Sequence, residues 1–154
     1  MSTRFAIAAG AALAVFTAPA AGAVSPDDLV DLRTQASEIL AGNDLDAAVA
    51  TLGKSESGLL DLDGPGLHTW GFKESGEIIW DHSGQTTPGM DISSMTTPEG
   101  GPIIEQIVTS VREDDGHVVW ESSIPHPTTG EVKAVHLLCD SFAKARFFCV
   151  MAWP

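Results

Sequence analysis

Positive charge is scarce in this sequence, and tyrosine is absent. The 154 residues include 8 Lys and Arg against 21 Asp and Glu, which gives a formal net charge of −13 at pH 7. Binding to nucleic acid or to anionic lipid begins with cationic contacts to phosphate groups. So acidic a chain argues against both kinds of partner, and any anionic ligand needs a locally positive pocket.

Familiar catalytic and metal-binding motifs are also missing. The sequence contains no GxSxG, no HExxH and no glycine-rich phosphate loop. Its five histidines, at positions 68, 82, 117, 126 and 136, have neither the HxH nor the i, i+4 spacing that places two imidazoles on one face. We therefore expect no enzyme, no cofactor and no metal site. Histidines that converge across strands keep metal binding open as an alternative.

Long apolar runs are missing beyond the first residues. The segment 5–19 is mostly apolar, follows Arg4 and is succeeded by the small residues 21–23, which is the pattern of a secretory signal peptide. No later stretch approaches the ~18 apolar residues of a membrane span. We predict cleavage after Ala23, which leaves residues 24–154 as a single periplasmic or secreted domain. An uncleaved N-terminal anchor is the alternative.

Only two cysteines are present, Cys139 and Cys149. In an oxidising compartment, a small and even number of cysteines favours a structural disulfide. Lys144 lies midway between them, so a hairpin that turns there places the two cysteines opposite each other. Opposed residues on antiparallel strands lie about 4.5–5.5 Å apart at Cβ, close to the separation in a disulfide. We predict this bridge, with two buried free thiols as the alternative.

Helix and strand signals alternate along the rest of the chain. Leu29, Leu32 and Ala36 recur at helical spacing, whereas His68, Trp70 and Phe72 alternate with smaller residues as in a strand. Residues 83–101 are rich in glycine and proline, which indicates an irregular crossover with one helical turn around 92–95. The pattern predicts helices from 25 to 42, from 43 to 52 and after Pro102, and strands over 67–73, 77–82, 117–124, 131–141 and 146–153. An α+β domain with helices mainly on one face of an antiparallel sheet accommodates these elements.

Three segments resemble a single Cache domain, the extracytoplasmic relative of the PAS fold. They are HTWGFKESGEIIWDH at 68–82, TPEGGPIIEQIV at 97–108 and PHPTTGEVKAVHL at 125–137. Two positions depart from the family pattern, since Thr97 stands where Asp is usual and His136 where an aromatic residue is usual. The resemblance implies a PAS/Cache-like five-stranded antiparallel sheet with N-terminal helices and a crossover helix.

Cache domains are sensors outside the membrane, and the resemblance implies a binding site for a small organic acid or amino acid. A lysine suits the ligand carboxylate, histidines supply hydrogen bonds, and tryptophans form apolar walls. The predicted ligand contacts are Lys133, His136, His82, Trp70, Trp80 and Trp120. Core packing is the alternative for the tryptophans, and a solvated position is the alternative for the lysine.

The sequence also leaves the mode of action open. No signalling region follows Pro154, so we expect a free-standing domain that acts through a partner such as a membrane receptor. Pairing of two copies through the N-terminal helices stays open. The alternative functions are a degenerate domain for structure or protein interaction, whose own side chains fill the pocket, and the histidine-based metal site.

Overall fold

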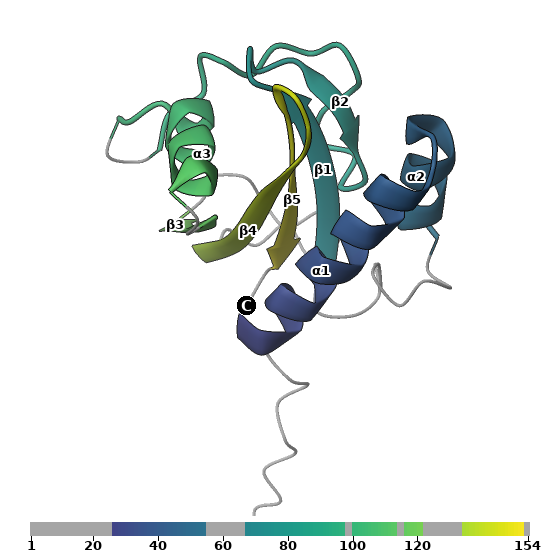
Figure 1. Ribbon diagram of the computed structural model, residues 1–154. Helices are drawn as coiled ribbons and strands as arrows, with labels where there is room; N and C mark the ends of the chain where they lie inside the picture. The colour runs from purple at the N-terminus through teal and green to yellow at the C-terminus, as the bar shows by residue number, and fades with distance from the viewer. Residues whose placement is uncertain (1–25, 55–66, 98–99, 114–115, 122–133, 153–154) are drawn as a thin grey trace, which may run out of the picture.

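The computed structural model describes residues 26–54, 67–97, 100–113, 116–121 and 134–152. They form a five-stranded antiparallel sheet with helices on both sides, as Figure 1 shows. The strand order is β2-β1-β5-β4-β3, so the first and last strands of the chain lie side by side at the centre. The strands are β1 (Leu67–Lys73), β2 (Ile78–Asp81), β3 (His117–Glu121), β4 (Ala134–Ala143) and β5 (Arg146–Ala152). The predicted five-stranded α+β fold is confirmed.

Helices α1 (Pro26–Gly42) and α2 (Leu45–Leu52) cover one side of the sheet, which we call the helix side. Leu29, Leu32 and Ala36 are buried, as their spacing along one helical face predicts. Asp44 begins α2, where its side chain accepts a hydrogen bond of 3.0 Å from the N–H of Ala47. The sheet residues that pack against these helices are Trp80, Leu138, Phe148, Val150 and Ala152.

Helix α3 (Ile103–Arg112) covers the opposite side, which we call the α3 side. Its residues Ile103, Ile104, Ile107 and Val108 are buried against the sheet. The expectation that helices pack mainly on one face is therefore wrong. The central strands are apolar on both sides, and a sheet of this kind needs cover on both.

The turns at one end of the sheet are tied together. Gly76, in the β1–β2 turn, has φ +91°, and a Cβ there would lie 2.7 Å from the backbone nitrogen of Ser93, so glycine is required. The β4–β5 turn contains Ala145, whose backbone oxygen accepts a 2.9 Å hydrogen bond from the N–H of Glu74. The two hairpins are consequently held against each other at their tips.

The crossover after β2 runs along the outer edge of that strand. The N–H of Ile78 donates to the oxygen of Met90, and the N–H of Gly89 donates to the oxygen of Ile78, both at 2.8 Å. Residues 92–95 form a single turn, closed by a 3.0 Å bond from the N–H of Met95 to Ile92, where the sequence predicted a helical turn. Thr96 pairs with Pro102 and is therefore extended, so the turn at 92–95 does not continue as a helix.

Several expectations lie outside the described residues. The predicted signal peptide, residues 1–23, is among them, and so are the segments 122–124 and 131–133 of two predicted strands. Within the described ranges, no helix is long and apolar enough to cross a membrane.

Candidate functional site

The α3 side of the three central strands is nearly uniform in chemistry. Successive strand residues point to opposite sides of a sheet, and the register identifies the side chains that share this one. The buried and half-buried ones are His68, Trp70 and Phe72 of β1, Val135, Leu137 and Cys139 of β4, and Phe147, Cys149 and Met151 of β5. Eight of these nine are apolar or disulfide-bonded, so the α3 side is an apolar wall that contains one imidazole.

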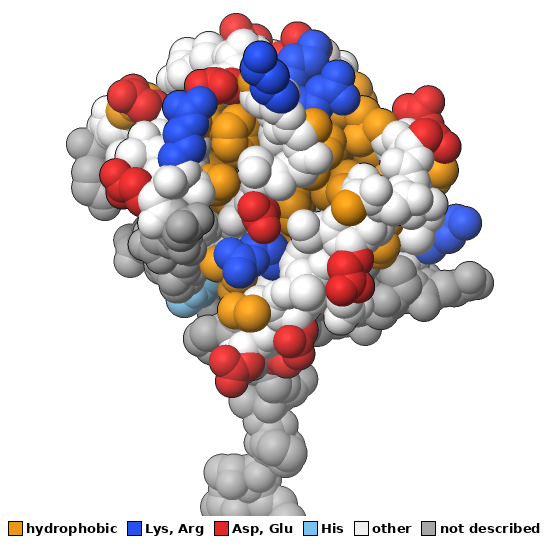
Figure 2. All heavy atoms as spheres, viewed as in Figure 1, with side chains coloured by type: hydrophobic (Ala, Val, Ile, Leu, Met, Phe, Trp, Pro, Cys, Tyr) orange, Lys and Arg blue, Asp and Glu red, His pale blue; other side chains and the backbone are white. Residues whose placement is uncertain are grey.

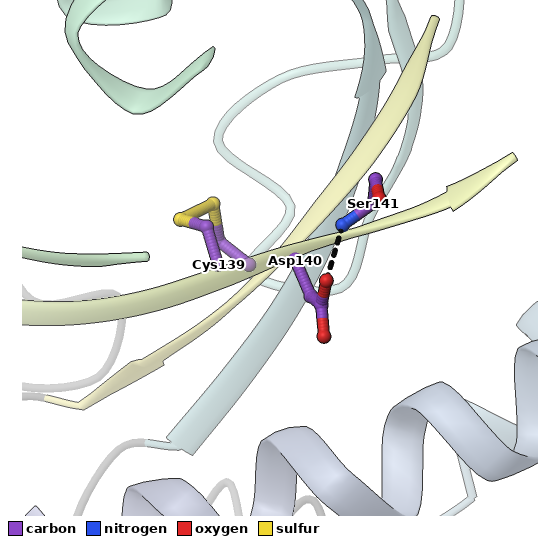
Figure 3. Close-up of a disulfide and its surroundings, with 4 residues drawn as sticks. Cys139, Asp140 and Ser141 are labelled. Carbon is purple, nitrogen blue, oxygen red and sulfur yellow. Dashed lines mark hydrogen bonds between the residues drawn. A yellow bond between two sulfur atoms is a disulfide. The ribbon is translucent and has the colours of Figure 1, made fainter. Parts of the chain in front are cut away.

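The disulfide lies in the middle of this wall. Cys139 and Cys149 are directly opposite each other on β4 and β5 and are joined by a bond of 2.08 Å. Figure 3 shows the sulfur atoms on one side of the sheet and the side chain of Asp140 on the other. The predicted disulfide is confirmed, and it links β4 to β5 on the side that faces α3.

Trp70 also belongs to the α3 side and lies next to Cys149 in the register. Its ring stacks on Phe72 with centroids 4.8 Å apart, and Phe72 stacks on Phe147 at 5.7 Å. Trp70 is 9% exposed, whereas Phe72 is fully buried. Of the predicted ligand contacts whose side chains are described, Trp70 is the one on this wall.

His68 is the polar member of the wall and was not among the predicted ligand contacts. It lies opposite Met151, is two residues before Trp70, and is only 2% exposed. Sequence reasoning treated it only as one histidine among five. The alternation of His68, Trp70 and Phe72 was the signal that could have placed it beside the tryptophan.

Trp80 and His82 lie on the helix side, in a chain of hydrogen bonds centred on Thr69. The indole N–H of Trp80 donates to Thr69 Oγ1 at 3.3 Å, and Thr69 Oγ1 is 2.8 Å from His82 Nδ1. The His82 ring also bonds the backbone of Val49, in α2. Burial lowers the pKa of His82 below the ordinary 6.5, although Asp81 opposes this shift. A neutral ring can accept at Nδ1 and donate at Nε2, so His82 fastens α2 to the first hairpin.

Of the three remaining predicted contacts, only His136 has a described side chain, and it lies away from Trp70. His136 is half-buried and alternates with Val135 and Leu137, which places it on the helix side, opposite Ala152. Trp120 lies on β3, where the structure does not describe its side chain, and Lys133 is outside the described residues. The four contacts whose side chains are described, Trp70, Trp80, His82 and His136, thus lie on both sides of the sheet and form no single cluster.

Positive charge gathers at the end of the sheet formed by the two tied turns. Figure 2 shows lysine and arginine side chains concentrated at the upper end of the molecule. Lys73 pairs with Arg146 in the register, Lys144 lies in the adjacent turn, and Arg112 forms a 2.6 Å ion pair with Glu74. His68 is five residues from Lys73 along β1, about 16 Å at the rise of a strand. These cations are therefore remote from the imidazole of the wall.

A shallow hollow of about 370 Å³ runs along the exposed face of α3. It is lined by Pro102, Glu105, Gln106, Thr109, Ser110 and Glu113. Its two glutamates repel a carboxylate, so it does not suit the predicted ligand. In the part of the chain that the structure describes, no group of three or more His, Cys, Asp or Glu is arranged to hold a metal ion.

Several solved structures share this fold. A methyl-accepting chemotaxis protein from Vibrio parahaemolyticus superimposes with a TM-score of 0.62 at 10% identity, covering 80% of this chain and 82% of the other. A Cache chemosensory domain that recognises carboxylic acids gives 0.60 at 18%, covering 82% and 91%. The periplasmic sensor domain of a chemotaxis protein gives 0.52 at 16%, covering 79% and 84%. No protein-family model matches the chain, and no curated protein matches its sequence.

Proposed function

We propose that this chain is an exported, non-enzymatic sensor or solute-binding domain of the Cache type. It binds a small carboxylate or amino acid on the α3 side of its sheet and acts through a partner such as a membrane receptor. The observation that carries the proposal is the Cache-domain fold, shared with chemosensory domains over about four-fifths of the chain. A cleaved signal peptide at residues 1–23 delivers it to the periplasm or the exterior.

The α3 side is the better place for a ligand because the tryptophan and histidine of the helix side already bond within the protein. There, α1 and α2 cover the sheet, and the hydrogen bonds of Thr69, Trp80 and His82 are made within the protein. The α3 side offers an aromatic ring, a disulfide and a buried imidazole. Small-molecule sites combine an apolar lining with a few polar groups in this way.

Lys133 stays the predicted cation for the ligand carboxylate. It is one of 8 Lys and Arg in the sequence, and it directly precedes the first residue of β4. Four of the other cations are concentrated at the distant end of the sheet. An anionic ligand in an acidic protein needs such a local charge, because the overall field opposes its approach.

Two tryptophan replacements test the site against a matched control. Trp70→Phe and Trp80→Phe make the same change in one hairpin, at buried positions on opposite sides of the sheet. Isothermal titration with a panel of small carboxylates and amino acids should find a ligand for the wild type. Trp70→Phe should weaken its binding at least about tenfold, which is a loss of ~1.4 kcal/mol, and Trp80→Phe should leave it within about threefold.

The same titration distinguishes the proposal from an inert domain. The stacked rings of Trp70, Phe72 and Phe147 fill part of the α3 side, and this favours the alternative in which the protein's own side chains occupy the pocket. No heat above background across the panel would support the inert domain. Equal losses in the two tryptophan variants would remove the assignment to the α3 side.

A further inference from the structure

We propose that two copies of this chain pair symmetrically through the helix side of the sheet, next to the tied turns, with Phe142 at the centre of the contact. The dimer is independent of the ligand and the receptor proposed above. The register of β4 against β5 shifts between Ser141 and Ala143, which leaves Phe142 as an extra, bulged residue. A bulge re-aims a side chain, and this one presents an aromatic ring near the end of the sheet.

The ring of Phe142 covers a buried aromatic pair and is itself partly exposed. It packs edge-on against Trp80, with centroids 5.6 Å apart, and against Phe148 at 6.3 Å. Those two rings are buried, whereas Phe142 and Ile79, the extra residue of β2, are half-buried. Figure 2 shows apolar side chains at the surface between α1 and the cations of the upper end. The two helices therefore leave an apolar surface that a partner can cover.

A cation, Arg146, lies on one side of Phe142. Arg146 precedes Phe147 of the α3 side and therefore points to the helix side. It is exposed, and it forms no ion pair with any residue that the structure describes. Its neighbour across the ladder, Lys73, is already paired with Glu77 at 2.7 Å. Arginine and aromatic residues are enriched at protein interfaces, so Arg146 beside Phe142 suits a contact with an acidic group.

An anion, Asp140, lies on the other side of Phe142. Figure 3 shows its side chain on the side of the sheet away from the disulfide, which is the helix side. Its Oδ1 accepts a 2.7 Å hydrogen bond from the N–H of Ser141, and among the described residues it has no ion pair. Asp140 lies opposite Phe148, which is two residues from Arg146, or about 7 Å along the strand. The patch thus presents a cation, an aromatic ring and an anion in order.

This order is self-complementary. In a two-fold symmetric interface, each contact between two different residues occurs twice, with the copies exchanged. A two-fold axis through Phe142, perpendicular to the sheet, would place Arg146 of each copy against Asp140 of the other and bring the two phenyl rings together. Arginine and a carboxylate can then form a bidentate pair. The chain is therefore itself a partner with the chemistry that its own patch requires.

The net charge of −13 opposes this association at long range. At physiological ionic strength the Debye length is about 8 Å, so the repulsion between distant carboxylates is largely screened while contacts between the two patches persist. Sedimentation equilibrium is therefore best carried out at about 0.15 M salt. Under these conditions the wild type should show a monomer–dimer equilibrium with a Kd below about 1 mM.

Two charge reversals test the pairing. Arg146→Glu would place two carboxylates against each other, and Asp140→Lys would do the same with two cations. Each variant alone should raise the Kd of the dimer at least about tenfold. An equimolar mixture of the two variants should dimerise within about threefold of the wild type, because the reversed charges then face each other. Melting curves check that each variant is folded.

Arg112→Glu is the matched control. It makes the same change of charge at the same end of the sheet, but from α3, and it removes only an exposed ion pair with Glu74. The Kd should stay within about threefold of the wild type. Equal effects of Arg112→Glu and Arg146→Glu would mean that overall charge governs association, and the proposed interface would be wrong.

Three other results would overturn the dimer as proposed. The wild type could remain monomeric up to about 1 mM. It could dimerise with the same Kd in both reversal variants, which would assign the contact to another surface such as the N-terminal helices. Both variants could be weakened without recovery in the mixture, which would show that Arg146 and Asp140 do not pair across the interface. None of these results bears on ligand binding, which the titration of the tryptophan variants tests separately.

Discussion

The two sides of the sheet use similar residues for different purposes. Each side has a buried tryptophan from the first hairpin, Trp70 on the α3 side and Trp80 on the helix side, and each has a histidine nearby. On the helix side these groups bond one another through Thr69 and hold α2. On the α3 side they lie beside a disulfide in an apolar wall. Residue type alone therefore does not tell what a buried tryptophan or histidine does, because its role depends on the side of the strand on which it lies.

The largest expected effect comes from crowding the helix side at Gly71. A Cβ at Gly71 would lie 2.1 Å from Cζ3 of Trp80, whose ring is 3% exposed and covers the glycine. Because the ring has no room to move, Gly71→Ala should lower the free energy of unfolding by about 3 kcal/mol or more. Denaturation in urea measures this loss.

Gly42→Ala is the control for Gly71→Ala. A Cβ at Gly42, the last residue of α1, would have no atom within 4 Å. Its stability should change by less than about 1 kcal/mol, since alanine is the better helix former. Equal losses in the two variants would show that the packing of Trp80 on Gly71 does not limit stability.

A somewhat smaller effect is expected from opening the disulfide on the α3 side. The bridge closes a short loop, as the cysteines are 10 residues apart. Cross-links of this length restrict the unfolded chain by about 2–3 kcal/mol. The double variant Cys139→Ala, Cys149→Ala should lose that much stability in urea. Wild-type protein unfolded with a reductant present should show the same loss, and an unchanged midpoint there would contradict the prediction.

The smallest effect expected is a pH dependence on the helix side. Burial lowers the pKa of His82 below 6.5 in the folded protein. The unfolded chain therefore takes up the proton first, and His82 makes stability fall as pH drops from about 6.5 toward the lowered value. In melting curves at pH 7.5 and 5.5, His82→Gln should lose less stability over this range than the wild type. Equal losses would show that His82 does not contribute.

Local sequence patterns predicted much of the fold because the fold uses them directly. The turn at Lys144 set the register in which Cys139 meets Cys149, and no other part of the chain had to be known. The spacing of Leu29, Leu32 and Ala36 likewise gave the buried face of α1. Both predictions involve residues that are close in sequence.

The candidate site was harder to predict because it depends on which side chains of each strand point to the α3 side of the sheet. β2 carries one extra residue, Ile79, opposite the step from Gly71 to Phe72 of β1, so Trp80 meets Gly71 while Phe72 meets Ile78. Aromatic residues on both strands of a hairpin thus reach opposite sides, and no local pattern marks this shift. That His68 lies next to Met151 likewise depends on β5 lying beside β1, a pairing of residues far apart in the chain.

The crossover along β2 has a consequence for the behaviour of the protein at high concentration. An exposed sheet edge is a template on which a strand of another molecule can add, and long unprotected edges lead to aggregation. The bonds of Ile78 to Gly89 and Met90 already occupy that edge. A strand of another molecule could therefore pair with β2 at Ile78 only after the segment containing Gly89 and Met90 had been displaced.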